Sequence, residues 1–544
     1  MQGLMMDYSL TIEKILFRAR DNFPDQEIIS RMADESIHRY KFINFYERTV
    51  KLMNVLRSLG VKQNERVGTF AWNTYRHLEL YFAIPCIGSV LHTLNIRLFP
   101  EQLKFIVNHA EDQYIFVDAS LTKLLTPLQD EFKTVKKFIV MEDGAPVDPG
   151  LRNIVMYEDL LSKAEFKEDF PTLEENQAAA LCYTSGTTGD PKGALYSHRS
   201  TYLHSLGICM ADTLALSVQD TILPVVPMFH VNCWGVPYAC CLTGSKPVFP
   251  GAHLIGKPLA ELIQNEKVTL AAGVPSIWNP LYQFLKKNHY DVSSLRGLVV
   301  GGSAAPKAMI ENFDKDFGVK IIHAWGMTEM SPLGTVCTLK PEIKNLEDSV
   351  KYKYMAKQGL SVPMVEMKIV DDQGKSLPKD GVANGELLVR GPWIIKEYFN
   401  TESMDAKSAF TSDGWFKTGD IASIDSMGYL EITDRKKDLI KTRGEWLSSV
   451  EMENFLMSHE SILEATVVGR QDDVRGEAVV VFLVPKEGYI DNFNKHSIIH
   501  FLSEKFVKWQ IPKETDIHIV TSIPKTSVGK FDKKVLRAQL KGDS

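Results

Sequence analysis

The segment from Tyr183 to Gly193 carries the side chains of this sequence that are best suited to hold a phosphate group. It reads Tyr-Thr-Ser-Gly-Thr-Thr-Gly-Asp-Pro-Lys-Gly, with hydroxyl residues and glycines interleaved and one lysine near the end. Glycine lets backbone N–H groups approach an anion, hydroxyl groups add donors, and an ammonium group adds charge. We predict a phosphate-binding loop rather than a polar surface turn. The residues expected to contact phosphate are Thr184, Ser185, Gly186, Thr187, Thr188, Gly189 and Lys192.

The order of residues in this loop differs from that of a Walker A loop. A Walker A loop ends in Gly-Lys-Ser or Gly-Lys-Thr and leads into a helix. Here Lys192 precedes Gly193, and the next residues, Ala-Leu-Tyr, have the character of a strand. The pattern therefore disfavours a kinase of the P-loop class.

Four further motifs follow the loop along the chain. They are Trp325-Gly326-Met327-Thr328-Glu329, Thr418-Gly419-Asp420, Asp434-Arg435-Lys436-Lys437-Asp438 and Pro524-Lys525-Thr526-Ser527-Val528-Gly529-Lys530. In this order and spacing the sequence resembles the adenylate-forming superfamily of acyl-CoA synthetases, firefly-type luciferases and peptide-synthetase adenylation domains, over nearly the whole chain. The resemblance implies an ATP-dependent acid–thiol ligase. An acid and ATP would form an acyl-adenylate and pyrophosphate, and coenzyme A would then take the acyl group and release AMP.

The resemblance gives catalytic roles to four residues. Glu329 would bind Mg²⁺ together with the Thr184 hydroxyl, because a hard cation prefers oxygen ligands, and Thr328 would face the α-phosphate. Lys530 would place an ammonium group between the acyl carboxylate and the α-phosphate, which repel each other, and would so stabilise the transition state. His230 would lie near the carboxylate end of the acyl site. Without the other motifs, an exposed glutamate in a turn would be the favoured interpretation of Glu329.

Other residues of the motifs would bind the nucleotide. Adenine would lie between the glycine turn 301–303 and the segment 323–326, in which Trp325 replaces the tyrosine that most relatives carry. Asp420 would accept hydrogen bonds from the ribose hydroxyls, although an Asx turn is the alternative for this residue alone. The predicted nucleotide-binding residues outside the loop are Gly302, Ser303, His323, Ala324, Trp325, Gly326, Met327, Thr328, Asp420, Arg435, Lys437, Lys441 and Trp446.

The segment from Pro227 to Gly235 resembles the stretch that borders the acyl pocket. Val231 and Trp234 would contact the acyl group, and Trp234 resembles the indole that gates the fatty-acid tunnel of long-chain enzymes. A tryptophan packed in the core is the ordinary alternative. The likeness is greatest to medium- and long-chain fatty-acid–CoA ligases. The alternatives are a CoA ligase for a short thioether or aryl acid and an adenylation enzyme that loads a carrier protein. A non-enzymatic binding protein is disfavoured, because the catalytic residues occur together.

The elements that position these residues follow an α/β pattern. Runs rich in β-branched and aromatic residues alternate with helical patterns in the first half of the chain and again near residue 300. We expect strands at 66–71, 89–93, 114–118, 297–300 and 319–323, and helices at 77–84, 101–110 and 306–317. Such alternation favours a large N-terminal domain of layered, mostly parallel sheets with helices on their faces.

The character of the sequence changes after Asp434. Strands expected at 464–468, 478–484 and 516–520, with a helix at 495–507, form a small α+β unit of about 100 residues, the size of a domain. We divide the chain into an N-terminal AMP- and acyl-binding domain (1–433) and a mobile C-terminal lid domain (434–544) that carries Lys530, with Asp434 as the hinge. Within the lid, Ser448 begins a capping-box pattern. Lys533, Lys534 and Arg537 are interpreted as a solvated helix face, and Arg443, where relatives have a small residue, as a contact for a CoA phosphate.

The bulk composition limits the binding partners and the cell compartment that we expect. Hydrophobic residues make up 44% and charged residues 24%, which is typical of a globular protein, and the net charge of −6 gives no reason to expect a nucleic acid partner. The seven cysteines include no CxxC pair, which indicates reduced thiols. No signal peptide and no transmembrane segment is evident. We expect a cytoplasmic protein with the partners fatty acid, ATP and CoA, and the likeness to fatty-acid ligases is compatible with a homodimer.

Overall fold

The structure is a computed structural model that describes residues 1, 3–184, 190–401, 403–443, 445–472, 475–489, 493–526 and 531–542. Six predicted site residues lie outside the described residues, namely Ser185, Gly186, Thr187, Thr188, Gly189 and Lys530. Within the described ranges, no helix is long and apolar enough to cross a membrane.

The first sheet has seven strands, and all but the last neighbouring pair are parallel. Its central strands are buried on both faces, which explains why they read as continuous apolar runs in the sequence. In spatial order the strands are β7(Ile154–Met156), β6(Lys137–Met141), β5(Tyr114–Asp118), β3(Arg66–Phe70), β4(Val90–Thr93), β8(Ala178–Tyr183) and β9(Gly193–Ser197). The phosphate-loop motif joins the last two of these strands.

The second sheet has nine strands, with a parallel centre and antiparallel edges. In spatial order they are β16(Leu360–Ser361), β15(Leu333–Val336), β14(Lys320–Gly326), β13(Gly297–Val300), β12(Leu270–Gly273), β10(Thr221–Pro224), β11(Lys246–Phe249), β1(Glu27–Arg31) and β2(Ile37–Lys41). The helices of this N-terminal region are α1(Ile12–Asn22), α2(Phe42–Ser58), α3(Tyr75–Cys86), α4(Pro100–Ala110), α5(Thr122–Leu125), α6(Tyr157–Lys163), α7(His198–Cys209), α8(Val236–Thr243), α9(Lys257–Glu266), α10(Pro275–Lys287), α11(Lys307–Phe317), α12(Pro341–Lys344) and α13(Asp348–Met355).

A third, antiparallel sheet leads to the C-terminal domain. Its strands are β17(Glu366–Val370), β18(Gly385–Arg390), β19(Phe416–Ile424) and β20(Leu430–Arg435), with α14(Met404–Ser408) between the second and third of them. The predicted mixed α/β class with largely parallel N-terminal sheets is confirmed.

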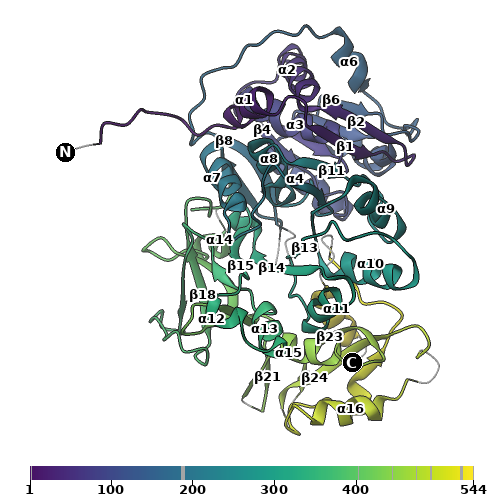
Figure 1. Cartoon of the computed structure of the whole chain (residues 1–544), viewed down its shortest axis with the longest axis vertical. Coiled ribbons are helices and arrows are strands. Elements are labelled where there is room, and N and C mark those ends of the chain that lie inside the picture. Colours follow the sequence, from purple (N-terminus) through teal and green to yellow (C-terminus); the bar gives the residue numbers. More distant parts are fainter. Residues whose placement is uncertain are drawn as a thin grey trace.

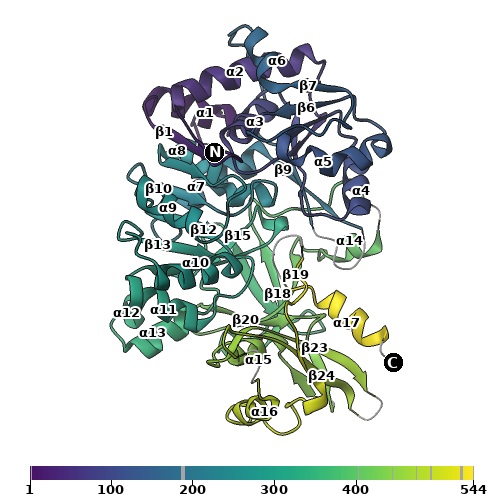
Figure 2. The same cartoon turned by 90° about the vertical axis from the view of Figure 1, so that its right-hand side faces the viewer.

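The described residues of the C-terminal domain form a five-stranded sheet and three α-helices. The elements are β21(Ile440–Thr442), β22(Glu445–Leu447), α15(Ser449–Leu456), β23(Ile462–Asp472), β24(Gly476–Pro485), α16(Lys495–Ser503), β25(Ile517–Ile519) and α17(Lys533–Gly542). The Ser448 hydroxyl accepts a hydrogen bond from the Glu451 N–H at 3.0 Å, so the predicted helix cap is confirmed. This domain lies at the opposite end of the molecule from α1 and α2 (Figures 1 and 2).

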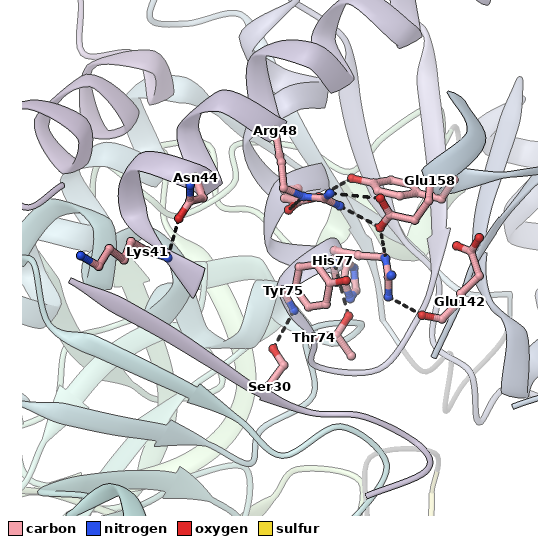
Figure 3. Close-up of polar contacts among 12 residues, drawn as sticks. Ser30, Lys41, Asn44, Arg48, Thr74, Tyr75, His77, Glu142 and Glu158 are labelled. Atoms are coloured by element: carbon pink, nitrogen blue, oxygen red, sulfur yellow. Dashed lines mark hydrogen bonds and ion pairs between the residues drawn. The ribbon is translucent and has the colours of Figure 1, made fainter. Parts of the chain in front are cut away.

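A cluster of partly buried ion pairs fixes three N-terminal helices to one another. Arg48 of α2 contacts Glu79 of α3 at 2.7 Å and Glu158 of α6 at 2.9 Å, and Arg76 of α3 reaches Glu158 at 2.7 Å (Figure 3). Glu79 is fully buried, and burial raises its pKa above the ordinary value. Each charge in such a cluster has an opposite charge as its partner, which makes the burial tolerable. The cluster thereby sets the position of α3.

The start of α3 in turn anchors the segment that was expected to border an acyl pocket. Asn73, just before the helix, donates to the carbonyls of Pro224 and Val226 at 2.8 Å each and accepts from the Met228 N–H at 2.6 Å. This side chain is buried and uses both ends of its amide. The path of the chain from β10 into that segment is therefore fixed by contacts to the first half of the molecule.

Candidate active site

Two adjoining cavities, of about 310 Å³ and about 270 Å³, lie where the second sheet, the third sheet and the C-terminal domain meet. Most of the predicted site residues that the structure describes line one of them. The larger cavity is lined by Thr184, His230, Val231, Trp234, Met327, Thr328, Glu329 and Lys437, among others. The smaller cavity is lined by Ser303, His323, Asp420 and Lys533, among others. Both are lined by Gly302, Ala324, Trp325, Gly326, Arg435, Asp438 and Phe531.

The carboxyl ends of two adjacent parallel strands form the wall between the cavities. β13 ends at Val300 and leads into the glycine turn, and β14 ends at Gly326, before the short helix η4(Thr328–Met330). Ligands of α/β proteins commonly bind at this edge of the sheet. A Cβ atom on Gly326 would lie 1.8 Å from the carbonyl oxygen of Pro332, so only glycine fits there.

Trp325 and Arg435 hold the carboxylate of Asp420 from two sides. The indole N–H donates to Oδ2 at 3.1 Å, and the Arg435 Nε donates to Oδ1 at 2.8 Å. Arg435 lies opposite Asp420 in the pairing of β19 with β20. The tryptophan that replaces the usual tyrosine thus has a polar role in addition to its ring. Each carboxylate oxygen can accept more than one hydrogen bond, so Asp420 keeps the capacity to accept from a ligand.

His323 supports the wall of the smaller cavity from behind. Its Nδ1 donates to the carbonyl of Ala356 at 3.1 Å, and its Nε2 accepts from the Ala305 N–H at 3.3 Å. Burial lowers the pKa of His323 to about 4, so the ring is neutral at physiological pH. Both ring nitrogens are engaged with the backbone, and the ring therefore fixes the glycine turn to β14.

The Thr328–Glu329 turn is held by backbone and tyrosine contacts. The hydroxyl of Tyr196 donates to the Thr328 carbonyl at 2.5 Å, and the Ile395 N–H donates to the Glu329 carbonyl at 2.9 Å. The hydroxyl of Tyr398 donates to Oε1 of the Glu329 side chain at 2.8 Å. Sequence reasoning missed both tyrosines, because each lies outside the motifs and contacts a residue more than 60 positions away.

The base of the phosphate-loop motif is closed by contacts between its two ends. The Thr184 N–H donates to the Lys192 carbonyl at 2.9 Å, and the Thr184 hydroxyl accepts from the Lys192 N–H at 3.2 Å. The ammonium group of Lys192 lies 5.4 Å from the centre of the Tyr398 ring. Tyr398 therefore contacts both Lys192 and Glu329.

An unusual left-handed turn places the residues expected at the acyl site. Val231, Asn232, Cys233 and Trp234 all have φ between 46° and 54°. This conformation costs energy for residues other than glycine, and most for a β-branched residue such as Val231. Buried contacts hold the turn, since the Cys233 thiol donates to the Val226 carbonyl at 3.0 Å. Strain that the surroundings maintain in this way is often found at ligand sites.

Trp234 lines the larger cavity instead of being enclosed in the core. Its indole is partly exposed and packs against Gly301, where an added Cβ would lie 2.8 Å from the ring. Beyond it the wall is apolar. That apolar wall is formed by Ile208, Leu214, Val299, Pro332 and Leu333.

The C-terminal domain brings some of its predicted residues to the cavities and leaves others outside. Lys437 lines the larger cavity, and burial lowers its pKa. Thr526 and Phe531, on either side of the segment that contains Lys530, also line it. Lys441 and Trp446 lie on the β21–β22 hairpin. As far as the described residues define the two cavities, neither lines them, and Trp446 is 58% exposed with the Lys441 ammonium 5.2 Å from its ring.

One interpretation of the C-terminal helix is wrong. Lys533 was expected on a solvated face, but its side chain is only 11% exposed and contacts Glu453 at 2.8 Å and the Ser449 hydroxyl at 2.6 Å. Burial acts to lower the pKa of Lys533, and the carboxylates of Glu453, Asp434 and Asp438 outweigh it and raise the pKa. Arg537 is also paired, with Asp438 at 2.7 Å, whereas Lys534 is exposed as expected.

The two residues expected to bind a cation, Glu329 and Thr184, both offer oxygen atoms. In the part of the chain that the structure describes, no three or more His, Cys, Asp or Glu side chains could hold a metal ion together. Glu329 is 7% exposed and lines the same cavity as the Thr184 hydroxyl. Mg²⁺ is commonly bound by one or two protein oxygens together with the phosphates of a substrate. The donor set thus fits Mg²⁺ that arrives with a nucleotide.

Comparisons with known proteins agree with this geometry. The model of the AMP-binding enzyme family matches residues 16–399, and that of the AMP-binding enzyme C-terminal domain matches residues 451–530. A long-chain-fatty-acid–CoA ligase of Thermus thermophilus is 42% identical, over 99% of this chain and 97% of the relative. A 3-methylmercaptopropionyl-CoA ligase of Ruegeria lacuscaerulensis is 41% identical, over 99% of both chains. The fold is similar to the crystal structure of an anthranilate CoA ligase in complex with anthranoyl-AMP, with a TM-score of 0.85, 23% identity, and coverage of 100% of this chain and 99% of the other.

Proposed function

Because this chain belongs to the AMP-binding enzyme family and is an acyl-CoA synthetase that uses ATP and CoA, we propose that its acid substrate is a medium- or long-chain fatty acid. The observation that supports this choice is the mixed lining of the larger cavity. Apolar side chains of Ile208, Leu214 and Trp234 line the same cavity as the Thr328–Glu329 turn, so a hydrocarbon chain and its carboxylate would each meet a matching surface. A short thioether acid is the second candidate, because a ligase for such an acid is 41% identical.

The proposed reaction needs no side-chain nucleophile. A carboxylate oxygen of the acid attacks the α-phosphorus of ATP, an acyl–phosphate bond forms, and pyrophosphate leaves. The sulfur of CoA then attacks the acyl carbon, the thiol loses its proton, and AMP leaves. The protein would contribute orientation and charge: Lys530 between the two anions of the first step, Thr328 at the α-phosphate, and His230 at the carboxylate.

The nucleotide would occupy both cavities. Adenine would pack between the glycine turn and Trp325, and the ribose hydroxyls would donate to Asp420, which Trp325 and Arg435 hold in place. Glu329 and Thr184 would hold Mg²⁺, which would neutralise phosphate charge. The C-terminal domain would act as a lid that turns about Asp434, bringing Lys530 to the site for the first step and the β21–β22 hairpin, with Lys441, Arg443 and Trp446, to the CoA side for the second.

Product analysis tests the proposed chemistry. With a fatty acid, ATP and CoA, the protein should release AMP and pyrophosphate, and without CoA it should exchange labelled pyrophosphate into ATP only when an acid is present. A panel of acids from short to long, with aryl and thioether acids included, should give the highest kcat/KM for a medium- or long-chain fatty acid. Release of ADP and orthophosphate would contradict the reaction. A preference for a thioether acid would contradict only the choice of substrate.

Trp234→Ala should change the preference for chain length or the KM for the acid, with the KM for ATP nearly unchanged, because the indole lines the acyl part of the cavity. The acid panel and thermal melting measure the two effects. Trp415→Ala is the matched control, since Trp415 is buried in a small cluster with Val370 and Leu388 away from the site. That control should lose stability, as large-to-small core changes do by about 3–5 kcal/mol, and keep its chain-length profile. If Trp234→Ala behaves like this control, Trp234 is only a packing residue.

A further inference from the structure

The segment that follows β18 connects the phosphate-loop motif to the Thr328–Glu329 turn. Its Phe399 N–H donates to the Gly193 carbonyl at 2.8 Å, at the far end of the loop motif. Its Ile395 N–H donates to the Glu329 carbonyl at 2.9 Å. The segment therefore contacts the two parts of the molecule that we place around the nucleotide phosphates.

A histidine connects the same segment to the near end of the loop motif. Nε2 of His109 contacts the Asn400 carbonyl at 3.1 Å, and Nδ1 contacts the Tyr183 hydroxyl at 2.6 Å. Because a carbonyl can only accept, Nε2 carries the proton, and in the neutral ring Nδ1 accepts from Tyr183. Tyr183 directly precedes Thr184, so one end of the loop motif is bonded to this segment directly and the other end through His109.

Tyr398 is the side chain at the centre of this arrangement. Its hydroxyl donates to Oε1 of Glu329 at 2.8 Å, and its ring lies 5.4 Å from the Lys192 ammonium. Because a carboxylate oxygen can only accept, the Tyr398 hydroxyl is the donor in this bond. Glu329 lines the larger cavity, whereas Tyr398 lines a separate cleft. Tyr398 thus contacts Glu329 from behind.

We propose that Tyr398 is a positioning residue that orients the Glu329 carboxylate and the Lys192 ammonium toward a magnesium–nucleotide substrate. A hydrogen bond to one carboxylate oxygen fixes the rotamer of a side chain that would otherwise have several, and it leaves the second oxygen for the cation. Partners of this kind, one step behind a metal ligand, commonly change metal affinity when they are removed. The inference rests on the proposed function, because that proposal places Mg²⁺ at Glu329.

Tyr398→Phe tests the hydroxyl alone, because phenylalanine keeps a ring beneath Lys192. Calorimetric titration of ATP without acid, at a series of Mg²⁺ concentrations, should show an apparent Mg²⁺ affinity about 10- to 100-fold weaker than in the wild type. The affinity for ATP in excess EDTA should stay the same. Tyr398→Leu should also weaken the binding of metal-free ATP, because it removes the ring that contacts Lys192.

Tyr282→Phe is the matched control, since the Tyr282 hydroxyl donates to the Asp316 carboxylate at 2.5 Å on the surface of α10 and α11. It makes the same chemical change and should leave Mg²⁺ dependence unaltered. A second measurement uses Glu329→Gln. If Tyr398 acts through Glu329, adding Tyr398→Phe to Glu329→Gln should cause no further loss of Mg²⁺ dependence.

The outcomes separate the two proposals. If wild-type protein binds ATP equally with and without Mg²⁺, the proposed cation site is wrong. If ATP binding by the wild type depends on Mg²⁺ and Tyr398→Phe retains the same Mg²⁺ affinity, the positioning role is overturned. It is also overturned if Tyr398→Phe and Glu329→Gln reduce the Mg²⁺ dependence independently in the double variant. Melting curves verify that each variant is folded. The Glu329→Gln variants with and without Tyr398→Phe can be compared at a temperature where both are native.

Discussion

Replacing Lys530 with alanine should slow adenylate formation from acid and ATP by about 100- to 1000-fold, the usual effect of removing one preorganised donor from a transition state. In the proposed first step the acyl carboxylate and the α-phosphate are both anionic and must approach each other. An ammonium group between them stabilises that approach, and alanine offers no charge. Acid-dependent exchange of labelled pyrophosphate into ATP measures this half-reaction without CoA.

The second half-reaction provides an internal control. When preformed acyl-adenylate and CoA are supplied, Lys530→Ala should form thioester at close to the wild-type rate, because in the proposed second step the lid would present its other face. Lys534→Ala removes an exposed lysine four positions further on and should leave both rates unchanged. A folded Lys530→Ala protein that loses both half-reactions would show that Lys530 has no role confined to adenylation.

Much of the fold could be predicted because its central strands are buried on both faces. The strands expected at 114–118 and 297–300 are β5 and β13 with those same bounds, and the helix expected at 101–110 differs from α4 by one residue. Such strands are continuous apolar runs and need no information about their neighbours. The motifs also converge as expected, since Gly302, Trp325 and Asp420 line one cavity.

The contacts that could not be predicted join residues far apart in the sequence. The sequence around Lys533 shows a charged residue on α17. It does not show that this side chain is buried against Glu453, which lies 80 positions earlier. Valine is among the least favourable residues for left-handed backbone, so Val231 gave no signal for its turn. Buried contacts of the turn residues hold it, including those of Cys233 with Val226 and of Asn232 with Cys182.

Lys533→Met should destabilise the C-terminal domain by about 3–5 kcal/mol, because it leaves the Glu453 carboxylate buried without its cation. Glu453 is buried, accepts from the Thr466 hydroxyl at 2.9 Å and the Val467 N–H at 2.8 Å, and faces Lys533 at 2.8 Å. Two hydrogen bonds to an anion do not replace an ion pair. Limited proteolysis and thermal melting should show the C-terminal domain opening before the N-terminal domain.

The second effect of Lys533→Met should be on Asp434, the proposed hinge. The Ser449 hydroxyl accepts from Lys533 and donates to Asp434 at 2.7 Å, so one chain of contacts joins α17, the start of α15 and the last residues of β20. Loss of the ammonium frees the beginning of α17, which follows the segment with Lys530, and adenylation should fall more than thioester formation.

Lys534→Met is the surface control. Lys533→Met combined with Glu453→Leu should recover most of the lost stability, because an apolar pair of similar volume can replace a buried ion pair at little cost. If the single variant melts like the wild type, or if the double variant is less stable than the single one, the buried pair does not hold the domain together.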